Sequence, residues 1–332
     1  MPPSDRLLSL VRACRGRRIA VVGDLIADEF IYGRVERVSR EAPVLILRYD
    51  QTLVVPGGAG NAAANVAALG GTVGLAALAG RDDVGRRLVR SLPSRVSRAA
   101  LVRPAGFHTP VKTRILAGGI HSAKQQVVRI DRIRTGGPGT RTRLQFASAA
   151  GRAVAAADAV IVSDYGSGLV TPALVAALTR RARRGVPFVL DSRHDTLKYR
   201  GLTACTPNES EVEQMLGVTI GDDPRALERA GRRLLTRTGM QAVVVTRGSR
   251  GMAVFERGLP TTHLGIFGSD EIADVTGAGD TVIATFTLAL SAGAGVVEAA
   301  RLATYAGGLV VMKRGTATVS AEELRGAIRG DA

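Results

Sequence analysis

Short apolar runs alternate along this chain with longer helical patterns, and this alternation constrains the fold more than any other feature. The runs at 19–22, 159–162, 188–190 and 242–245 are continuously apolar, as expected for parallel strands buried on both faces of a sheet. Residues 142–157, 172–184 and 224–236 have helical patterns, the last with Asp223 as N-cap and Pro224 at the first helical position. We therefore predict an α/β fold with helices on both faces of a mostly parallel, doubly wound sheet.

Two further segments, residues 30–55 and 109–131, do not follow this alternation. They contain the alternating run 44–49 and the strand-like runs 111–116 and 126–130, which are typical of amphipathic strands. We expect them to form a small β-strand lid over the end of the sheet where ligands bind. Since there is neither an internal repeat nor a long linker, we predict that residues 1–332 form a single domain with this lid inserted.

The composition excludes several classes of protein. Apolar residues make up 45% of the 332 residues. This is enough for a substantial core, yet no apolar run approaches the roughly 18 residues that span a membrane. Residues 1–18 contain no continuous apolar stretch of the signal-peptide kind, so we expect a cytoplasmic protein without a membrane partner. Two cysteines and four scattered histidines do not suit a disulfide framework or a zinc site.

The net charge of +16 at pH 7 would suit a protein that binds nucleic acid. The distribution of the charge argues against that function, because the basic residues are spread through the predicted helices and only four of the 45 are lysines. The densest cluster, residues 180–184, lies at a helix end, where cations interact favourably with the helix dipole. Aromatic residues that could stack on bases are scarce, at 4%. We expect no nucleic acid partner, and nucleic acid binding is only the alternative from another class of function.

The turn at residues 274–281 carries the strongest functional signal. Gly277, Ala278 and Gly279 have almost no side chains, so their backbone N–H groups can surround a phosphate oxygen at the positive end of the following helix. Asp280 lies within one turn of that phosphate, where its carboxylate can take a proton from a substrate hydroxyl that attacks phosphorus. The alternative without a function is a glycine-rich helix start with an ordinary acidic residue in its first turn.

A second glycine cluster, residues 56–61, precedes an alanine-rich helical pattern. Gly58, Gly60 and Ala63 satisfy a loose dinucleotide fingerprint, which would make the protein an oxidoreductase. The cluster follows a lid strand instead of the first βα turn. We therefore favour a helix start at which a small ligand approaches the backbone, with Asn61 and Asn65 on one helical face. Close packing of the helix against the sheet is the structural alternative. No P-loop motif occurs.

Polar residues at predicted strand ends complete the set of candidates. Asp24 and Asp28 follow the first strand, where carboxylates can accept hydrogen bonds from sugar hydroxyls or be ordinary loop acids. Asp164 closes the strand that precedes it. Asn208 and Glu211 follow the run 202–207 and suit a magnesium ion held through water, although the pair alone is more typical of a helix cap.

Together these motifs resemble those of the PfkB (ribokinase-like) carbohydrate kinases. Residues 274–280 resemble the second signature of the family, residues 57–61 the first, and residues 207–211 its N-x-x-E magnesium motif, in the same order over nearly the whole chain. The resemblance implies a ribokinase-like three-layer αβα sandwich with ATP and Mg²⁺ as cofactors. It also implies a monovalent cation such as K⁺ near the loops 274–276 and 314–316, and a homodimer that pairs through the lid.

Within the family the chain most resembles the kinases that phosphorylate the anomeric hydroxyl of D-glycero-β-D-manno-heptose 7-phosphate. That resemblance rests on residues 22–24, 39–44, 125–126, 129–131, 163–165 and 315–320. It implies formation of the 1,7-bisphosphate on the way to ADP- or GDP-heptose, and the alternative is a PfkB kinase for another sugar, sugar phosphate or nucleoside. Because bifunctional relatives continue into a nucleotidyltransferase domain and this chain stops after the kinase motifs, we expect a stand-alone kinase.

Position by position, the resemblance assigns roles to the candidate residues. Asp280 would be the general base, and Gly277, Ala278 and Gly279 would form the anion hole. The sugar phosphate would be bound by Asp24, Asp28, Gly57, Gly58, Asn61, Lys112, Arg114, Arg129, Asp164 and Arg193, with Lys112, Arg114 and Arg129 at its phosphate. The nucleotide and its magnesium would be bound by Asn208, Glu211, Thr246, Arg247, Gly248, Thr276, Thr304 and Gly307, the metal through water at Asn208 and Glu211.

Three positions depart from the heptose kinase pattern. Ser167 stands where D-Y-x-K-G has a lysine, Arg193 replaces the lysine of D-P-K-G, and Thr304 replaces an asparagine on the adenine side. Loss of a lysine near the phosphates removes a positive charge that would stabilise the transition state, and Arg193 can partly supply it. These changes leave the reaction class intact and the identity of the sugar phosphate open.

Overall fold

A mostly parallel sheet lies at the centre of the protein, in a computed structural model that describes residues 3–118, 124–133, 136–268 and 274–331. Within these residues its ten strands are β1 (Arg18–Gly23), β4 (Thr72–Leu78), β5 (Val96–Ser97), β6 (Leu101–Val102), β9 (Ala159–Asp164), β10 (Phe188–Ser192), β11 (Ala204–Cys205), β12 (Ala242–Thr246), β13 (Met252–Glu256) and β14 (Thr262–Leu264). Their order is β14-β13-β12-β11-β10-β9-β1-β4-β5, and β6 pairs with β4. The antiparallel pairs β12/β13 and β13/β14 lie at one edge. The predicted, mostly parallel sheet is confirmed.

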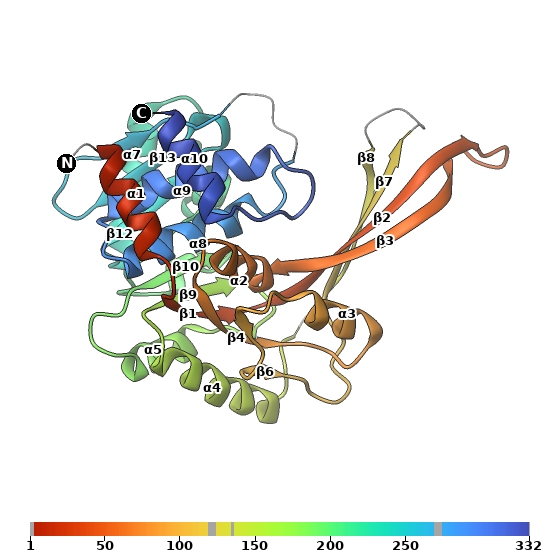
Figure 1. The fold of residues 1–332 in the computed structure, drawn as a ribbon, viewed down its shortest axis with the longest axis horizontal. Coiled ribbons are helices and arrows are strands. Elements are labelled where there is room, and N and C mark those ends of the chain that lie inside the picture. The colour runs from red at the N-terminus through yellow and green to blue at the C-terminus, as the bar shows by residue number, and fades with distance from the viewer. Residues whose placement is uncertain (1–2, 119–123, 134–135, 269–273, 332) are drawn as a thin grey trace.

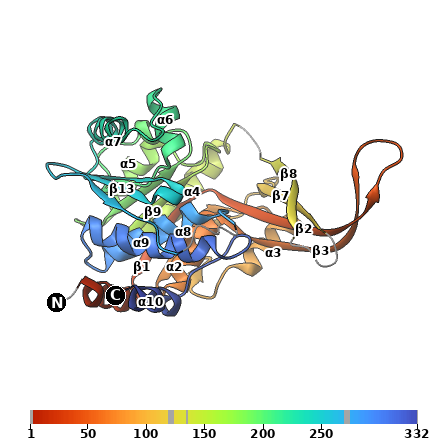
Figure 2. The ribbon, with the colours of Figure 1, turned by 90° about the horizontal axis from the view of Figure 1, so that it is seen from above.

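Helices cover both faces of this sheet, so the body of the protein has three layers (Figure 2). One face carries α1 (Pro3–Ala13), α2 (Ala59–Ala68), α3 (Asp83–Ser91), α8 (Ala278–Ser291), α9 (Val296–Val311) and α10 (Ala321–Gly330). The other carries α4 (Thr140–Ala155), α5 (Pro172–Arg181), α6 (Glu209–Leu216) and α7 (Pro224–Thr238). Apolar side chains between the layers form two core clusters, one on each face of the sheet.

Strand β1 shows why a continuously apolar run indicates a strand buried on both faces. Successive side chains of a strand point to opposite faces of the sheet. Ile19 and Val21 therefore belong to the core cluster beneath α2 and α8, whereas Ala20 and Val22 belong to the cluster beneath α4. All four side chains are at most 1% exposed.

The two irregular segments form a separate sheet, as predicted. Its strands are β2 (Leu25–Val38), β3 (Leu45–Gly58), β7 (Val111–Gly118) and β8 (Gln125–Arg132), in the order β3-β2-β7-β8. This sheet, the lid, extends away from the three-layered body (Figure 1). Strand β2 begins two residues after β1 ends, so the lid starts earlier than the predicted residue 30. The connection between β7 and β8 includes residues 119–123, outside the described part of the chain.

The helix boundaries agree with the predictions to within a few residues. Asp223 caps α7 by accepting a hydrogen bond from the N–H of Arg225, as expected. The predicted end of α5 at residue 184 is wrong, because the helix ends at Arg181 and a turn follows, in which Gly185 has φ +82°. Helix α4 lies two residues nearer the N-terminus than predicted. Within the described segments, no helix is both long and apolar enough to cross a membrane.

Candidate active site

The carboxyl ends of the parallel strands, the lid and the start of α8 enclose a cavity of about 340 Å³, here called the polar cavity. Its lining comes from β2, β7, the loops after β9 and β10, the start of α6 and the turn before α8. The predicted site residues that line it are Asp28, Gly58, Lys112, Arg114, Arg193, Asn208, Glu211, Thr246, Thr276, Gly277, Gly279 and Asp280. Motifs far apart in the sequence thus meet in one place.

A second cavity of about 320 Å³, the apolar cavity, lies beside it. The two share Asn208, Thr246, Val275 and Gly279 in their walls. The apolar cavity is also lined by the predicted residues Gly248, Ala278, Thr304 and Gly307, and by Met252, Ile266, Phe267, Val282 and Val311. The arrangement offers a polar compartment for charged groups beside an apolar one for a flat ring, joined at the start of α8.

Asp280 is buried in the wall of the polar cavity, next to Gly279, which both cavities share. Only 4% of the residue is exposed, and both carboxylate oxygens accept hydrogen bonds, from Asn61 Nδ2 at 2.9 Å and from the Tyr165 hydroxyl at 3.1 Å. Burial raises the pKa of Asp280 to about 6, against the opposing effect of these two donors. A carboxylate with such a pKa is ionised at neutral pH and basic enough to accept a proton.

A chain of buried amides fixes Asn61. Its Oδ1 accepts from Asn65 Nδ2 at 3.1 Å, and Asn65 Oδ1 accepts from the Thr281 hydroxyl at 3.1 Å and from the Val319 N–H at 3.3 Å. Helices α2 and α8 are therefore linked beside the carboxylate. Gly60 on α2 packs closely against the base of the lid, because an added Cβ would lie 2.5 Å from Leu25 Cδ1 on β2.

The turn before α8 has the shape expected of an anion-binding helix start. Gly277 is its N-cap, with φ +78°, a conformation that favours glycine. Asp274 braces the turn by accepting hydrogen bonds from the N–H groups of Thr276 and Gly315, both at 2.9 Å. The Ala278 N–H donates to the Val275 carbonyl at 3.2 Å within the turn. The first amides of a helix have no carbonyl partner within it, so those of Gly279 and Asp280 are the ones this turn offers to an anion.

The sugar-binding candidates on the lid are pre-arranged by mutual contacts. Asp28 is buried, pairs with Arg114 at 2.5 Å and accepts from the Thr316 hydroxyl at 3.1 Å. A Cβ added to Gly57 would lie 2.3 Å from Asp28 Oδ2, so only glycine leaves room for this carboxylate. Arg114, predicted at the substrate phosphate, is therefore already neutralised by Asp28.

Lys112 and Arg193 carry the remaining positive charge of the polar cavity. They flank the Tyr165 ring, with Lys112 Nζ 4.8 Å and Arg193 Cζ 5.1 Å from its centroid. Burial, and then the nearby Arg193 charge, lower the pKa of Lys112. Among the described residues neither has a carboxylate within ion-pair distance, so the pair favours an incoming anion.

Asn208 and Glu211 form a capping box at the start of α6, as the structural alternative predicted. Both also line the polar cavity, together with Asp191. Burial, and then the charge of Asp280, raise the pKa of Asp191 to about 8, and burial raises that of Glu211. The described residues contain no group of three or more His, Cys, Asp or Glu side chains that could hold a metal ion directly. The acidic wall fits a cation that keeps its water shell, as Mg²⁺ does.

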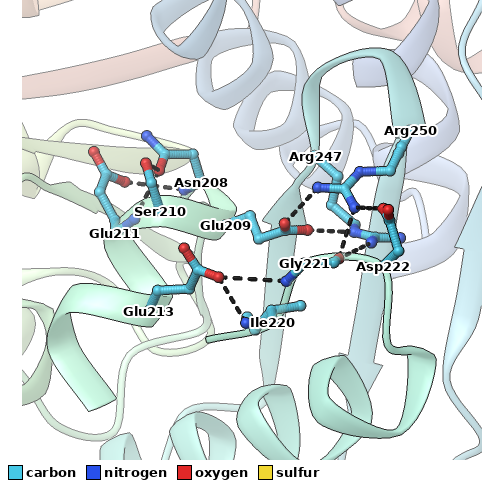
Figure 3. A network of polar contacts seen from close by, with 10 residues as sticks. All are labelled: Asn208, Glu209, Ser210, Glu211, Glu213, Ile220, Gly221, Asp222, Arg247 and Arg250. Carbon is cyan, nitrogen blue, oxygen red and sulfur yellow. Dashed lines mark hydrogen bonds and ion pairs between the residues drawn. The ribbon is translucent and has the colours of Figure 1, made fainter. Parts of the chain in front are cut away.

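Gly57 and Asn61 lie beside Asp28 and Asp280 without lining either cavity, and four further predicted site residues also lie outside both cavities. Asp24 accepts hydrogen bonds from the Tyr165 N–H and the Ser167 hydroxyl and borders a different cavity. Asp164 is buried and accepts from Ser192 and Tyr199. Arg129 pairs with Asp131 at 2.9 Å on β8, an exposed strand. Arg247 pairs with Glu209 at 2.6 Å (Figure 3). The structure thus gives each of these side chains a protein partner.

Tyr165 and Asp191 are among the residues of the polar cavity that sequence reasoning left out of the predicted site. Tyr165 follows Asp164 and was considered only as part of a family motif, although its hydroxyl contacts Asp280. Asp191 lies on the strand after β9 and carries the same signal that drew attention to Asp164, a carboxylate at the carboxyl end of a buried strand. Applying that signal to every predicted strand would have found it.

A buried carboxylate beside a glycine-rich helix start, with a separate apolar compartment, suits an enzyme that moves a phosphoryl group from a nucleotide to a hydroxyl. Comparison with known sequences agrees with this class. The chain belongs to the pfkB family of carbohydrate kinases, whose family model matches residues 17–324. It is an ATP-dependent sugar kinase, and the family implies ATP and Mg²⁺ as its cofactors.

Two relatives are similar over most of this chain. The bifunctional protein HldE of Caulobacter vibrioides is 40% identical over 325 residues, which are 96% of this chain and 65% of that protein. HldE of Geobacter sulfurreducens is 40% identical over 314 residues, 93% of this chain and 62% of that protein. The chain therefore spans somewhat less than two thirds of the length of these relatives.

Solved structures confirm the ribokinase-like fold. Ribokinase of Arabidopsis thaliana, complexed with ribose and ATP, has a TM-score of 0.71 at 19% identity, over 95% of this chain and 99% of that chain. Phosphofructokinase-2 from Escherichia coli, in complex with potassium, has a TM-score of 0.73 at 18% identity over the same shares. At these identities the likeness concerns the fold alone.

Proposed function

We propose that this kinase transfers a phosphoryl group from ATP to the anomeric O1 of D-glycero-D-manno-heptose 7-phosphate. The product, the 1,7-bisphosphate, would be an intermediate in the synthesis of ADP- or GDP-heptose. The observation that carries the proposal is that the polar cavity has two cations, Lys112 and Arg193, whose charges are not matched by carboxylates of the described residues, so that one remains for the sugar when the other faces the transferred group. A sugar that already bears a phosphate needs such cations, whereas a neutral sugar does not. The similarity to the HldE proteins supports the same substrate class.

The two cations have different neighbours, and we assign them different phosphates. Lys112 lies on lid strand β7 and is influenced by the charges of Asp28 and Asp131, so it would bind the phosphate of the sugar. Arg193 is influenced by the charges of Asp191 and Glu211, beside the start of α6, so it would face the transferred group. This division replaces the predicted phosphate residues Arg114 and Arg129, which are held by Asp28 and Asp131.

The remaining site residues have complementary roles in the proposed reaction. Asp280 would take the proton of O1 as oxygen attacks phosphorus, with Asn61 and Tyr165 holding the carboxylate in place. The amides at the start of α8 would stabilise the charge on the transferred group. The adenine would occupy the apolar cavity, near Phe267 and Thr304. Magnesium, held through water at Asn208 and Glu211, would supply neutralising charge for the phosphates.

Lys112→Met tests the substrate assignment. We expect KM for heptose 7-phosphate to rise about 10- to 100-fold with little change in KM for ATP, because a charge-assisted hydrogen bond to phosphate is lost. ADP release measured over a range of each substrate gives both constants. Lys124→Met is the matched control, since Lys124 lies beside the lid and pairs with Asp50 outside the polar cavity. An unchanged KM for the sugar phosphate in Lys112→Met would contradict the assignment.

A panel of heptose 7-phosphates, hexose phosphates, free sugars and nucleosides separates this proposal from its alternative. Turnover restricted to a heptose 7-phosphate is the expected result. Turnover on free sugars alone would reject the heptose phosphate and leave a pfkB kinase of another specificity.

The pH profile provides a test of the base. Because the pKa of Asp280 is about 6, kcat/KM is expected to fall as the pH drops below about 6 and the carboxyl group becomes protonated. Tyr165→Phe removes a donor that stabilises the carboxylate, so the acid limb should move up by about one pH unit. Tyr199→Phe, which removes a 2.8 Å hydrogen bond to Asp164 away from the polar cavity, should leave it in place. An unchanged acid limb in Tyr165→Phe would show that this hydroxyl does not stabilise the carboxylate of Asp280.

We also propose a homodimer that pairs through the lid and acts in the cytoplasm, where ATP is made. Most of the exposed large apolar side chains in the described part of the chain belong to the lid, among them Val38, Leu45, Tyr49, Leu53 and Val128. Such a patch on a soluble enzyme favours association with a partner surface. The mass in solution, measured by light scattering, tests this directly, and a monomer at micromolar concentration would contradict it.

A monovalent cation near the start of α8 belongs to the same proposal. Asp274 joins the loops 274–276 and 314–316 by accepting hydrogen bonds from the N–H groups of Thr276 and Gly315, so the two loops lie next to each other. Higher kcat in potassium than in a large organic cation at equal ionic strength is the expected result.

A further inference from the structure

Glu209, the residue that follows Asn208, lines neither of the two cavities. Glu209 is the first residue of α6, and its carboxylate pairs with two arginines from the loop after β12 (Figure 3). Glu209 Oε2 accepts a hydrogen bond from Arg247 Nε at 2.6 Å, and Oε1 accepts one from Arg250 Nη2 at 2.5 Å. Each carboxylate oxygen thus has its own guanidinium partner.

These charges are held in a largely buried position. The side chains of Glu209 and Arg247 are 12% and 13% exposed, so neither is well solvated by water. Arg250 is more exposed and also pairs with Asp222 and donates to the carbonyl of Gly221 (Figure 3). A charge pair in such a position is sensitive to the loss of one partner, because the other charge then remains buried and uncompensated.

The ion pairs of Glu209 with Arg247 and Arg250 connect two segments that form walls of the active site. On one side, Asn208 lines both cavities and Glu211 lines the polar one. On the other, Thr246 lines both cavities, and Gly248 and Ser249 line the apolar one. The same two segments are also joined by their backbones. The Thr246 N–H donates to the Pro207 carbonyl at 2.9 Å, and Asn208 forms an isolated parallel bridge with Thr246.

We propose that Glu209 is a positioning residue that fixes, through Arg247 and Arg250, the spacing between the magnesium residues of α6 and the nucleotide loop after β12. The inference rests on the proposed roles of Asn208 and Glu211 at the metal and of the apolar cavity at the adenine. Arg247, predicted from sequence to contact the nucleotide, acts instead through Glu209. The lid, which holds the sugar residues Asp28 and Lys112, takes no part in this cluster.

The proposal predicts that a change at Glu209 affects the binding of MgATP and not that of the sugar phosphate. A metal ion held through water requires its protein partners at a set distance, and partners that orient such residues typically change metal affinity or activity by 10- to 100-fold when altered. Loosening the two walls should therefore weaken binding of MgATP, while the sugar phosphate, held by lid residues and Asp280, should bind as before.

Glu209→Gln is the direct test. We expect both KM and the calorimetric Kd for MgATP to rise about tenfold and half-maximal activity to require more Mg²⁺, with KM for the sugar substrate within about twofold of wild type. Glu228→Gln is the matched control. Glu228 lies on the neighbouring helix α7, outside both cavities, where it pairs with Arg232 at 2.8 Å and accepts a hydrogen bond from Thr261. Its Kd for MgATP should be unchanged.

A second set of variants keeps the inference open to rejection. Arg247→Gln should also weaken MgATP binding, and the double variant with Glu209→Gln should be no worse than either single variant, since the two residues act as one unit. Should Glu209→Gln fail to fold, Arg250→Gln removes one partner at the more exposed end and is expected to raise the Kd in the same direction.

Two outcomes would overturn the inference. A lower melting temperature with an unchanged Kd for MgATP would reduce the cluster to a purely structural role, and equal rises in both KM values would indicate general distortion of the site. Direct binding of MgATP separates this result from failure of the proposed substrate. The Kd comparison remains decisive even if heptose 7-phosphate is not turned over.

Discussion

Asp280→Asn is expected to lower kcat by about 10²- to 10⁴-fold while KM for ATP changes little. The amide has nearly the same shape as the carboxylate but cannot accept the proton of the attacking hydroxyl. Stability should not suffer. The native pKa of about 6 lies above the ordinary value of 3.8, so keeping Asp280 ionised costs the folded protein stability above about pH 6, a cost that is absent below about pH 4. The uncharged variant should therefore melt at the same temperature as wild type or higher at pH 8.

Single-turnover and steady-state ADP release, with melting curves at pH 5 and pH 8, measure these effects. Asp223→Asn is a suitable control, because asparagine caps a helix as well as aspartate does and Asp223 lies at the start of α7. A variant at position 280 that retains more than about a tenth of the wild-type kcat would remove Asp280 from the role of general base.

Gly277→Ala is expected to lower kcat/KM by about 10²- to 10³-fold and to cost about 1–2 kcal/mol of stability. The residue has φ +78°, and an added Cβ would lie 2.5 Å from Asn61 Nδ2, the donor that holds Asp280. Either the turn shifts and its amides no longer point at the transferred group, or Asn61 moves and Asp280 loses a hydrogen bond. Kinetics and chemical denaturation of the same preparation measure both effects.

Gly293→Ala separates backbone strain from damage to the site. Gly293 follows the other end of α8 with φ +89°, and no atom lies within 4 Å of an added Cβ. This variant should lose a similar amount of stability and retain wild-type kcat/KM. A comparable loss of activity in both variants would trace the effect to helix α8 as a whole and not to the contact with Asn61.

Local patterns were sufficient for the parts of the fold that depend on burial alone. The strands around Val21 and Val243 are apolar throughout because helices cover both faces, and sequence shows this directly. The end of α5 was missed because the basic residues after Arg181 are as compatible with a helix as with the turn they form. Residues 274–281 were assigned correctly as a helix start because all the determinants of that turn are adjacent in sequence.

The partners of charged side chains were the part that sequence could not provide. Arg114 is neutralised by Asp28, 86 residues away, through the register of two lid strands. Arg247 is bound by Glu209, 38 residues away. In contrast, Arg129 and Asp131 are two apart on one strand, so their pairing on one face follows from strand geometry and could have been anticipated.

The two long lid strands, β2 and β3, are attached to the three-layered body at one point, which we call the pivot, next to the active site. Strand β2 leaves the body at Leu25 and β3 returns at Gly58, and the Ala59 N–H donates to the Asp24 carbonyl at 3.0 Å, which joins the two points. Asp28 lies three residues from Leu25, close to this pivot, whereas Val38 and Leu45 pair with each other at the far end of the two strands. We therefore expect a displacement at the tip, such as contact with a second copy, to pass along the paired strands β2 and β3, across their two register shifts, to the carboxylate proposed to hold the sugar.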